Sequence, residues 1–535
     1  MTAARHASTI PRWGSDGARA LLLAGLLACG AAPSRDGVAV IASGADLESA
    51  NPLVTVHPLA RQIQRHVLFV TLARYDSTLH PVPYFARRWS WSADRRTLTL
   101  SLAHDLRWHD GAPTTARDAV FTFDAARDPR TGSPRAGELA TLESSSAPDD
   151  TTLVLRFATA QPALPAFLCE LPIVPEHLLA RVPREAMRRD PFATAPVGNG
   201  PFRFVERVAT QRWVFERNEQ FPPALGGPPL LRRLVVAVVD EPATKMAGLV
   251  SGDLDMAGIA PTMAPLAARD PTLRVVEYPI SLSIGLVFNV HHPALADRRV
   301  REAISLSIDR ARIIAAAAGG FGTPAAGPVP DASPFALGEP ALRDTVRADS
   351  LLDAAGWRRT AGGVRARGAP LSLELLTVGS GENVAEQLIQ ADLAARGIGV
   401  TIRQLEMGAF LARARARPRR FGVLLTGIAG DVALSQIPAM FDTRFRGGAL
   451  DYGDFHTASL DSLLARTRSA SSDAELAAAW RGVQRELARE VPVAWIYHAR
   501  GIQGVARRLG GVRMDLRGEL ATVSSWTTDA ARRAR

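Results

Sequence analysis

The sequence predicts an α/β protein with two or three lobes, and three observations support this expectation. The chain has 535 residues, which is too long to be organised around a single hydrophobic core. Residues 97–128 join a strand pattern to a helix pattern, and residues 371–402 read as strand, helix and strand. A crossover of that kind predicts parallel strands with the helix on one face of the sheet.

The segment 97–128 shows how these elements follow one another. Three leucines between residues 97 and 102 alternate with polar residues, which is the pattern of a strand with one buried face. His109-Asp110-Gly111 supplies residues typical of a turn. Thr115 can then cap a helix, and Asp118 is well placed in the positive first turn of that helix.

In the segment 371–402, leucines alternate from Leu371 to Leu375, a helix is expected to end at Gly397, and isoleucine and valine alternate from Ile398 to Ile402. The residues expected to line one face of this helix are Val384, Leu388, Ala391 and Ala395. Other expected elements are strands at 38–41, 153–157 and 234–239, the last of them buried, and helices at 63–72, 245–250 and 474–487, with a further helix that opens at 297 and includes Ile308-Asp309-Arg310.

Residues 1–28 are expected to form a lipoprotein-type signal peptide. Three arginines precede the apolar run 20–28, which is too short for a membrane span of about twenty residues. Leu26-Leu27-Ala28-Cys29 resembles a lipobox, in which Cys29 becomes the lipidated first residue of the mature protein. Plain secretion without lipidation is the alternative, and either outcome takes the chain out of the cytoplasm.

Composition and motifs exclude several function classes. The net charge is +10, but Lys245 is the only lysine and arginines are scattered along the chain, so nucleic acid is not an expected partner. The densest run, residues 413–420, lacks aromatic residues and is expected to be a solvated helix end and loop. Cys169 lies in an apolar run and is expected to be a buried small hydrophobe.

No nucleophile elbow, Walker A loop, His-Glu-x-x-His or Cys-x-x-Cys occurs in the sequence. We therefore expect a protein that is not an enzyme and has neither a cofactor nor a metal site. One set of possible metal ligands is present, but its aspartates sit where turns favour them, so turns are the preferred interpretation. That set is His104, Asp105, His109 and Asp110.

Several motifs resemble those of the family 5 extracytoplasmic solute-binding proteins, the dipeptide- and oligopeptide-binding components of ABC importers. Trp108-His109-Asp110-Gly111 stands for the Phe-His-Asp-Gly of that family, and Val197-Gly198-Asn199-Gly200-Pro201 stands for Val-Gly-Thr-Gly-Pro. Further matching blocks lie at 173–179, 297–303 and 348–357. The matches follow one another in the order of the family from about residue 38 to about residue 505.

The resemblance implies a two-lobed periplasmic-binding-protein-like fold of type II, with an extra subdomain inserted in the first lobe. It implies hinges near residues 280 and 495 and ligand capture by closure of the lobes. The expected limits are 37–85, 190–280 and 496–535 for lobe I, 86–189 for the inserted subdomain, and 281–495 for lobe II.

The resemblance also implies a monomer of the periplasm or cell envelope, held to a membrane by its lipid. Such a protein captures peptides and delivers them to an ABC-type permease with its ATPase subunits. Nickel, haem and oligosaccharides are carried by the same family and remain alternatives. An extracytoplasmic hydrolase is the alternative from another class.

In peptide-binding relatives the ligand lies extended between the lobes and pairs with strands from both. An acidic residue meets its amino terminus within a Trp-x-x-Asp-x-x-(Asp/Glu)-Pro-like stretch. Residues 424–432 correspond to this stretch, with Leu425 for the Trp, Ile428 for the first acid and Asp431 as the only carboxylate. A loop aspartate without ligand contact is the alternative. The implied ligand-binding residues are Asp431, Gly427, Thr426, Ser49, Asn51 and Leu53.

Overall fold

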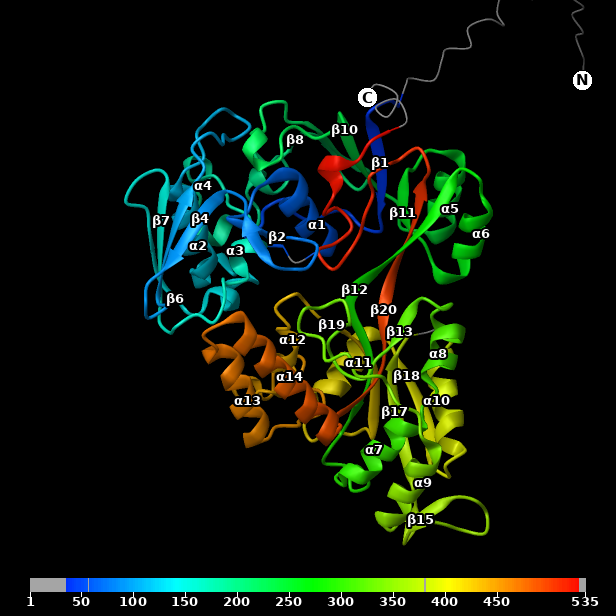
Figure 1. Ribbon diagram of the computed structural model, residues 1–535. Coiled ribbons are helices and arrows are strands. Elements are labelled where there is room, and N and C mark those ends of the chain that lie inside the picture. Colours follow the sequence, from blue (N-terminus) through cyan, green and yellow to red (C-terminus); the bar gives the residue numbers. More distant parts are fainter. Residues whose placement is uncertain (1–34, 56, 380–381, 529–535) are drawn as a thin grey trace, which may run out of the picture. The chain divides into compact units, whose positions relative to one another are not determined.

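The computed structural model describes residues 35–55, 57–379 and 382–528 (Figure 1). The described residues from Gly37 to Thr528 form one compact unit. The predicted signal peptide 1–28 and Cys29 lie outside the described residues. Among the described residues, no helix has both the length and the apolar character needed to cross a membrane.

An eleven-stranded mixed sheet organises the described part of the chain. In spatial order the strands are β18 (Gly399–Leu405), β17 (Ser372–Val378), β19 (Val423–Ala429), β12 (Leu273–Phe288), β20 (Val493–Ala506), β11 (Met256–Gly258), β1 (Val38–Ser43), β10 (Arg233–Val238), β9 (Arg212–Arg217) and β8 (Phe202–Val208), with β13 (Gly322–Pro324) paired to β20. Strands β1 and β10 pair in parallel, as do β17 and β18, whereas β12 is antiparallel to both β19 and β20.

The two long strands β12 and β20 pair with each other from Leu273 to Val287, and the pairing is irregular at two places. The register shifts between Pro279 and Ser283 of β12, and it shifts again where Ile496 of β20 has no opposite residue. Bulges bend and twist a strand pair locally. Both irregularities lie close to the positions expected for hinges, and a hinge role for them remains a prediction.

One group of buried residues surrounds the strands on the β1 side. It joins residues 39–236, Met256 and residues 505–526 in a continuous core. The elements on this side include a two-stranded sheet of β2 (Ala73–Tyr75) and β3 (Pro81–Pro83), a four-stranded sheet in the order β4 (Ala86–Trp91), β5 (Thr97–Leu102), β7 (Thr152–Phe157) and β6 (Leu142–Ser146), and helices α1 (Pro58–Ile63), α2 (Ala116–Arg127), α3 (Phe167–Glu170), α4 (Glu176–Leu179), α5 (Pro242–Ser251) and α6 (Ala264–Arg269).

The strand, turn and helix predicted for residues 97–128 are confirmed as β5 and α2. Leu98 and Leu100 are fully buried, and polar residues alternate with them on the other face. Thr115 forms a capping box with Asp118. The Thr115 side chain accepts a hydrogen bond from the backbone of the first helical turn, and the Asp118 side chain accepts one from the Thr115 N–H. The local sequence is therefore sufficient to begin this helix.

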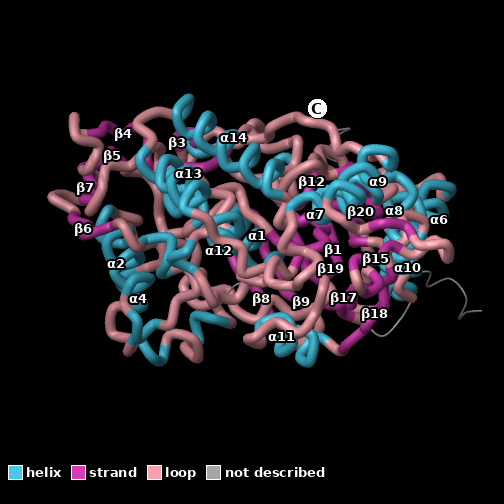
Figure 2. Tube along the Cα trace, turned by 90° about the horizontal axis from the view of Figure 1, so that it is seen from below, coloured by secondary structure: helices cyan, strands magenta, loops and turns pink. Residues whose placement is uncertain are grey.

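The strand–helix–strand unit predicted for residues 371–402 is confirmed as β17, α10 (Val384–Ala394) and β18, with parallel pairing. The predicted helix face is wrong in its second half: Leu388 packs on the core, but Ala391 and Ala395 are exposed, and Ile389 and Leu393 are the buried apolar residues of α10. Helix α7 (Arg298–Ser307) packs on α9 (Thr345–Ala354), and α8 (Arg310–Ala317) packs on α10 (Figure 2).

The part of the sheet that contains β17, β18 and β19 is packed around two clusters of buried residues from the segment 286–496. This segment also contains α11 (Met407–Arg415), α12 (Gln436–Phe441), α13 (Ala458–Ser469), α14 (Asp473–Glu490) and a small sheet of β14 (Arg358–Arg359), β15 (Arg365–Arg367) and β16 (Ala369–Pro370).

Three expected elements need correction. The helix that opens at Arg298 ends at Ser307, because Ile308 is extended and Asp309 caps a new helix, α8. The helix expected at 63–72 instead begins at Pro58, continues as a π-helical turn over Gln64–Leu68 and ends there. Strand β10 is only half-buried, with Leu234 and Val236 as its buried residues.

Candidate ligand-binding site

Strand β19 carries two of the predicted ligand-binding residues, Thr426 and Gly427, along a half-paired edge. β19 pairs with β12 over its whole length, but it pairs with β17 only at Val423 and Leu424. From Leu425 to Ala429 its second edge therefore has no strand partner among the described residues. An unpaired edge of this kind offers backbone N–H and C=O groups to an extended chain.

The hydrogen-bond pattern shows which residues face this open edge. The Gly430 N–H donates to the carbonyl oxygen of Ser281 in β12 at 2.7 Å. In an antiparallel pair the backbone groups of successive residues point to opposite edges, so those of Gly430, Ile428 and Thr426 face β12. Gly427 and Ala429 consequently present their backbone groups to the open edge, and both residues are exposed. This placement supports Gly427 as a ligand contact, a role that remains a prediction.

Asp431 is the second residue after the end of β19 and is half-buried. The Ser435 N–H donates to Asp431 Oδ1 at 3.0 Å, and the Ser435 hydroxyl donates to Asp431 Oδ2. The Leu434 N–H donates to the Asp431 carbonyl oxygen at 3.2 Å. Asp431 thus closes its own loop, and this role in the loop does not depend on a ligand.

A second group of polar residues lies within electrostatic range of Asp431. Burial raises the pKa of Tyr75, at the end of β2, and the carboxylates of Glu170 and Asp431 raise it further, while the charge of Arg65 acts in the opposite direction. Tyr75 therefore stays a neutral hydrogen-bonding phenol at neutral pH. Arg65 pairs with Glu170 Oε1, and Arg61 Nη2 lies 3.2 Å from Glu170 Oε2.

We call Arg61, Arg65, Tyr75 and Glu170 the Tyr75–Glu170 group. Its two arginines share one carboxylate, so the group carries an excess positive charge. Burial lowers the pKa of Arg61, and the charge of Arg135 lowers it further although Glu170 acts in the opposite direction. Sequence reasoning missed this group because its members come from β2, α1, the adjoining π-helical turn and α3, which no common motif connects.

The other three predicted ligand-binding residues are buried within their own loop. Ser49, Asn51 and Leu53 are at most 5% exposed. Ser49 Oγ accepts from the Asn51 N–H at 3.0 Å, and Asn51 Oδ1 accepts from the Leu53 N–H at 3.0 Å. These side chains shape the loop beside α1, and their contact with a ligand remains a prediction.

The possible metal ligands of the turn segment are not brought together. His109 Nε2 lies 3.0 Å from the Gly200 carbonyl oxygen, and burial lowers the pKa of His109 to about 4. Asp110 Oδ2 lies 2.8 Å from His177 Nε2. His104 and Asp105 are exposed. The preferred turn interpretation agrees with these positions. Cys169 is buried, as predicted.

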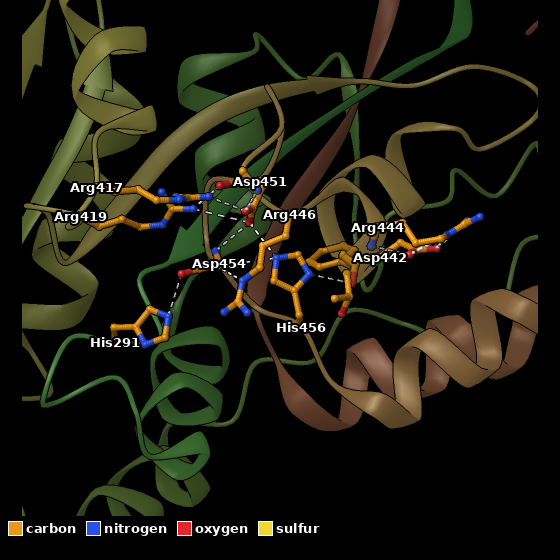
Figure 3. Close-up of polar contacts among 12 residues, drawn as sticks. His291, Arg417, Arg419, Asp442, Arg444, Arg446, Asp451, Asp454 and His456 are labelled. Carbon is orange, nitrogen blue, oxygen red and sulfur yellow. Dashed lines mark hydrogen bonds and ion pairs between the residues drawn. The ribbon is translucent and has the colours of Figure 1, made fainter. Parts of the chain in front are cut away.

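Within the described residues, Asp451, Asp454 and His456 form the one cluster whose ligand atoms lie close enough to hold a metal ion (Figure 3). Arg417 Nη2 already donates to Asp451 Oδ2 at 2.6 Å, and Arg446 Nε donates to Asp454 Oδ1 at 3.1 Å. Carboxylates neutralised by guanidinium groups are poor ligands for a further cation, so this cluster does not fit a metal.

The expectation that residues 413–420 are solvated is wrong for part of this run. Arg419 has a side chain that is 3% exposed, and it lies 3.5 Å from Asp451 Oδ1. Arg413 pairs with Glu374 at 2.6 Å. The carboxylates that fix these arginines come from other segments, so the local composition gave no signal of the burial.

Comparison with known proteins places this architecture in a family. The model of the bacterial extracellular solute-binding proteins, family 5 (Middle), matches residues 80–445, which is more than half of the chain. A Brucella ovis protein named as an ABC transporter peptide-binding protein is 33% identical over 344 residues, which cover 63% of either chain. The match thus spans less than two thirds of that relative.

Two further proteins extend the comparison. The nickel-binding periplasmic protein of Escherichia coli is 27% identical over 67% of this chain and 69% of its own. The oligopeptide-binding protein AppA of Bacillus subtilis, solved in complex with a nonapeptide, has a TM-score of 0.71 at 21% identity and covers 92% of this chain and 98% of its own. The chain therefore belongs to the family 5 bacterial extracellular solute-binding proteins.

Proposed function

We propose that this protein is the solute-binding component of an ABC importer and that its solute is a peptide. The observation that carries the peptide assignment is the open edge of β19 from Leu425 to Ala429, which ends beside the carboxylate of Asp431. An extended peptide can add to such an edge through backbone hydrogen bonds, which do not depend on the peptide's side chains. Thr426 and Gly427 would be its neighbours on the strand.

The charge of Asp431 fits one end of a peptide. Its carboxylate is available to the amino terminus, and a charge-assisted hydrogen bond there would fix the direction of the chain. The Tyr75–Glu170 group lies near the same end of the edge, because the charge of Asp431 contributes to the raised pKa of Tyr75.

Capture is proposed to proceed by movement about the irregular positions of β12 and β20. Two bulged strands can bend where their register shifts, near Pro279 and Ile496. A ligand that binds the closed state more tightly shifts the population toward closure. The proposed partners are the ABC permease and its ATPase subunits. The proposed membrane anchor is a lipid on Cys29.

Native mass spectrometry tests the ligand class. The purified protein is incubated with a mixture of unrelated tripeptides and pentapeptides, and in a separate sample with nickel chloride and free histidine. We expect peptide complexes that weaken when the same peptides are N-acetylated. Retention of nickel with no peptide complex would contradict the peptide assignment. Binding of N-acetylated and free peptides to the same extent would contradict the role of Asp431 at the amino terminus.

Small-angle scattering tests the mechanism. A saturating peptide should decrease the radius of gyration, and it should raise the melting temperature by linkage. Scattering curves that coincide with and without bound peptide would argue against closure, even if the peptide binds. Mass spectrometry therefore tests which ligand binds, and scattering tests independently whether binding closes the lobes.

A further inference from the structure

A pocket of about 500 Å³ lies at the opposite end of β19 from Asp431. It is lined by residues that follow β12 (289–293), by residues 417–422 before β19, by Glu374 of β17 and by Asp454. β19 has seven residues, so its two ends are about 20 Å apart at the usual rise per residue. The pocket is therefore separate from the proposed peptide site. Its charged and titratable lining residues are His291, His292, Glu374, Arg417, Arg419, Arg420 and Asp454.

Positive charge exceeds negative charge around this pocket. Glu374 pairs with both Arg413 and Arg403, at 2.6 and 3.6 Å. Asp451, just behind the lining, pairs with Arg417 at 2.6 Å and Arg419 at 3.5 Å. Each of these two carboxylates can neutralise only one of its two arginines.

The third carboxylate, Asp454, binds Arg446 at 3.1 Å and lies 3.0 Å from His291 Nε2 (Figure 3). His456 adds a ring whose Nδ1 faces the Phe441 carbonyl oxygen at 3.2 Å and whose Nε2 lies 3.3 Å from Asp451 Oδ1. No excess negative charge remains in this cluster to balance the arginines.

Two of the arginines, Arg417 and Arg419, are held in place by Asp451. Asp451 is fully buried and also accepts from the Gly447 N–H at 2.7 Å, so its carboxylate cannot rotate away from Arg417. Arg419 is 3% exposed, and its Nε has no hydrogen-bond partner among the described residues. Arg420 is exposed, and no described residue pairs with its guanidinium group.

The electrostatics of Arg419 support an anion as the missing partner. Burial lowers the pKa of Arg419, and the charge of Arg417 lowers it further, while Asp451 and Asp454 act in the opposite direction without cancelling the shift. An anion in the pocket would oppose both effects. Planar guanidinium groups bind carboxylate and phosphate oxygens in pairs of hydrogen bonds.

We propose that this pocket binds a small oxyanion with two or more negative charges, of the phosphate or carboxylate type. Arg417 and Arg420 would contact the anion, and Asp451 would position Arg417. The pocket volume is in the range of sites for small metabolites. This proposal does not depend on the ligand of the β19 edge.

Isothermal titration calorimetry tests the proposal with two probes, inorganic phosphate and citrate, at constant ionic strength maintained with sodium chloride. We expect saturable binding of at least one probe, and the stronger probe identifies the preferred oxyanion. Arg420→Gln should weaken that binding at least fivefold. The melting temperature of this variant without added anion should match the wild type, because Arg420 has no partner among the described residues.

Arg485→Gln is the matched control, because Arg485 is an exposed arginine of α14 and does not line the pocket. It removes the same charge and should leave anion binding unchanged. Asp431→Asn should also leave it unchanged, which separates this pocket from the peptide site. The proposal is overturned if neither probe binds saturably, or if Arg420→Gln binds the preferred probe as tightly as Arg485→Gln does.

Discussion

His109 and Gly200, which are 91 residues apart, are joined by a hydrogen bond from the histidine Nε2 to the glycine carbonyl oxygen at 3.0 Å. The His109 N–H also donates to the Gly198 carbonyl oxygen at 2.7 Å. Two of the sequence blocks that carry the family resemblance therefore meet in space. Both blocks have a structural role, because the segment around Gly198 packs directly against the π-helical turn that ends at Leu68.

The close approach at Gly198 gives a stability prediction. A Cβ atom at this position would lie 2.0 Å from the Leu68 carbonyl oxygen, which is backbone and cannot move aside easily. Gly198→Ala should therefore decrease the free energy of unfolding by about 2 kcal/mol or more. Gly137→Ala is the control, because no atom lies within 4 Å of its added Cβ. Equal urea midpoints for the two variants would contradict this packing.

Stability should fall as the pH falls from about 6.5 toward 4. Burial lowers the pKa of His109 and of His498 to about 4 and that of His66 to about 3. The unfolded chain then binds more protons than the native state in this pH window, so the contribution of neutral histidine is complete above 6.5 and is lost below it. Urea unfolding at several pH values measures the slope.

A His109 variant isolates one of these contributions. Gln at position 109 can still donate to Gly200 but does not titrate, so His109→Gln should lower the slope by up to about 1.4 kcal/mol per pH unit. His104 is exposed, and His104→Gln should leave the slope unchanged. A steep slope that persists in His109→Gln would assign the effect to other groups.

Asp431→Asn should weaken the binding of a free-amine peptide by about 2 kcal/mol or more, roughly thirtyfold. The reason is that the ligand ammonium would lose its charged partner in a site with little water. An N-acetylated version of the peptide should bind both proteins equally. Calorimetry with the tightest peptide found by mass spectrometry provides the measurement.

Asp431 also accepts hydrogen bonds from Ser435, so a loop effect must be separated from a charge effect. Ser435→Ala removes the hydroxyl donor and keeps the carboxylate. If Ser435→Ala weakens peptide binding as strongly as Asp431→Asn does, Asp431 acts through the loop and not through the ligand.

The membrane anchor is tested with Cys29→Ala. This variant should change a membrane-associated protein into one that is soluble or unprocessed, because the thiol that would carry the lipid is removed. Fractionation of cells followed by immunoblotting measures the partition. Normal processing with unchanged membrane association in the variant would rule out lipidation at Cys29.

The sequence alone determined those features that depend on neighbouring residues. The capping box of Thr115 and Asp118 lies within one turn of helix, and the alternation in β5 follows from the two-residue period of a strand. The parallel unit of β17, α10 and β18 follows from the order of its segments. The family blocks also lie in the sequence itself, which explains why the family could be predicted from it.

Only the tertiary structure decided which side chains are buried and which charges are paired. The inner face of α10 is set by the surface on which the helix packs, so Leu393 is buried where the pattern favoured Ala391. Arg419 is buried because Asp451, 32 residues further along the chain, provides a partner. The open edge of β19 exists because β17 pairs with only its first two residues. Burial, pairing and exposure are set by segments that are distant in the sequence, and local patterns carry no information about those segments.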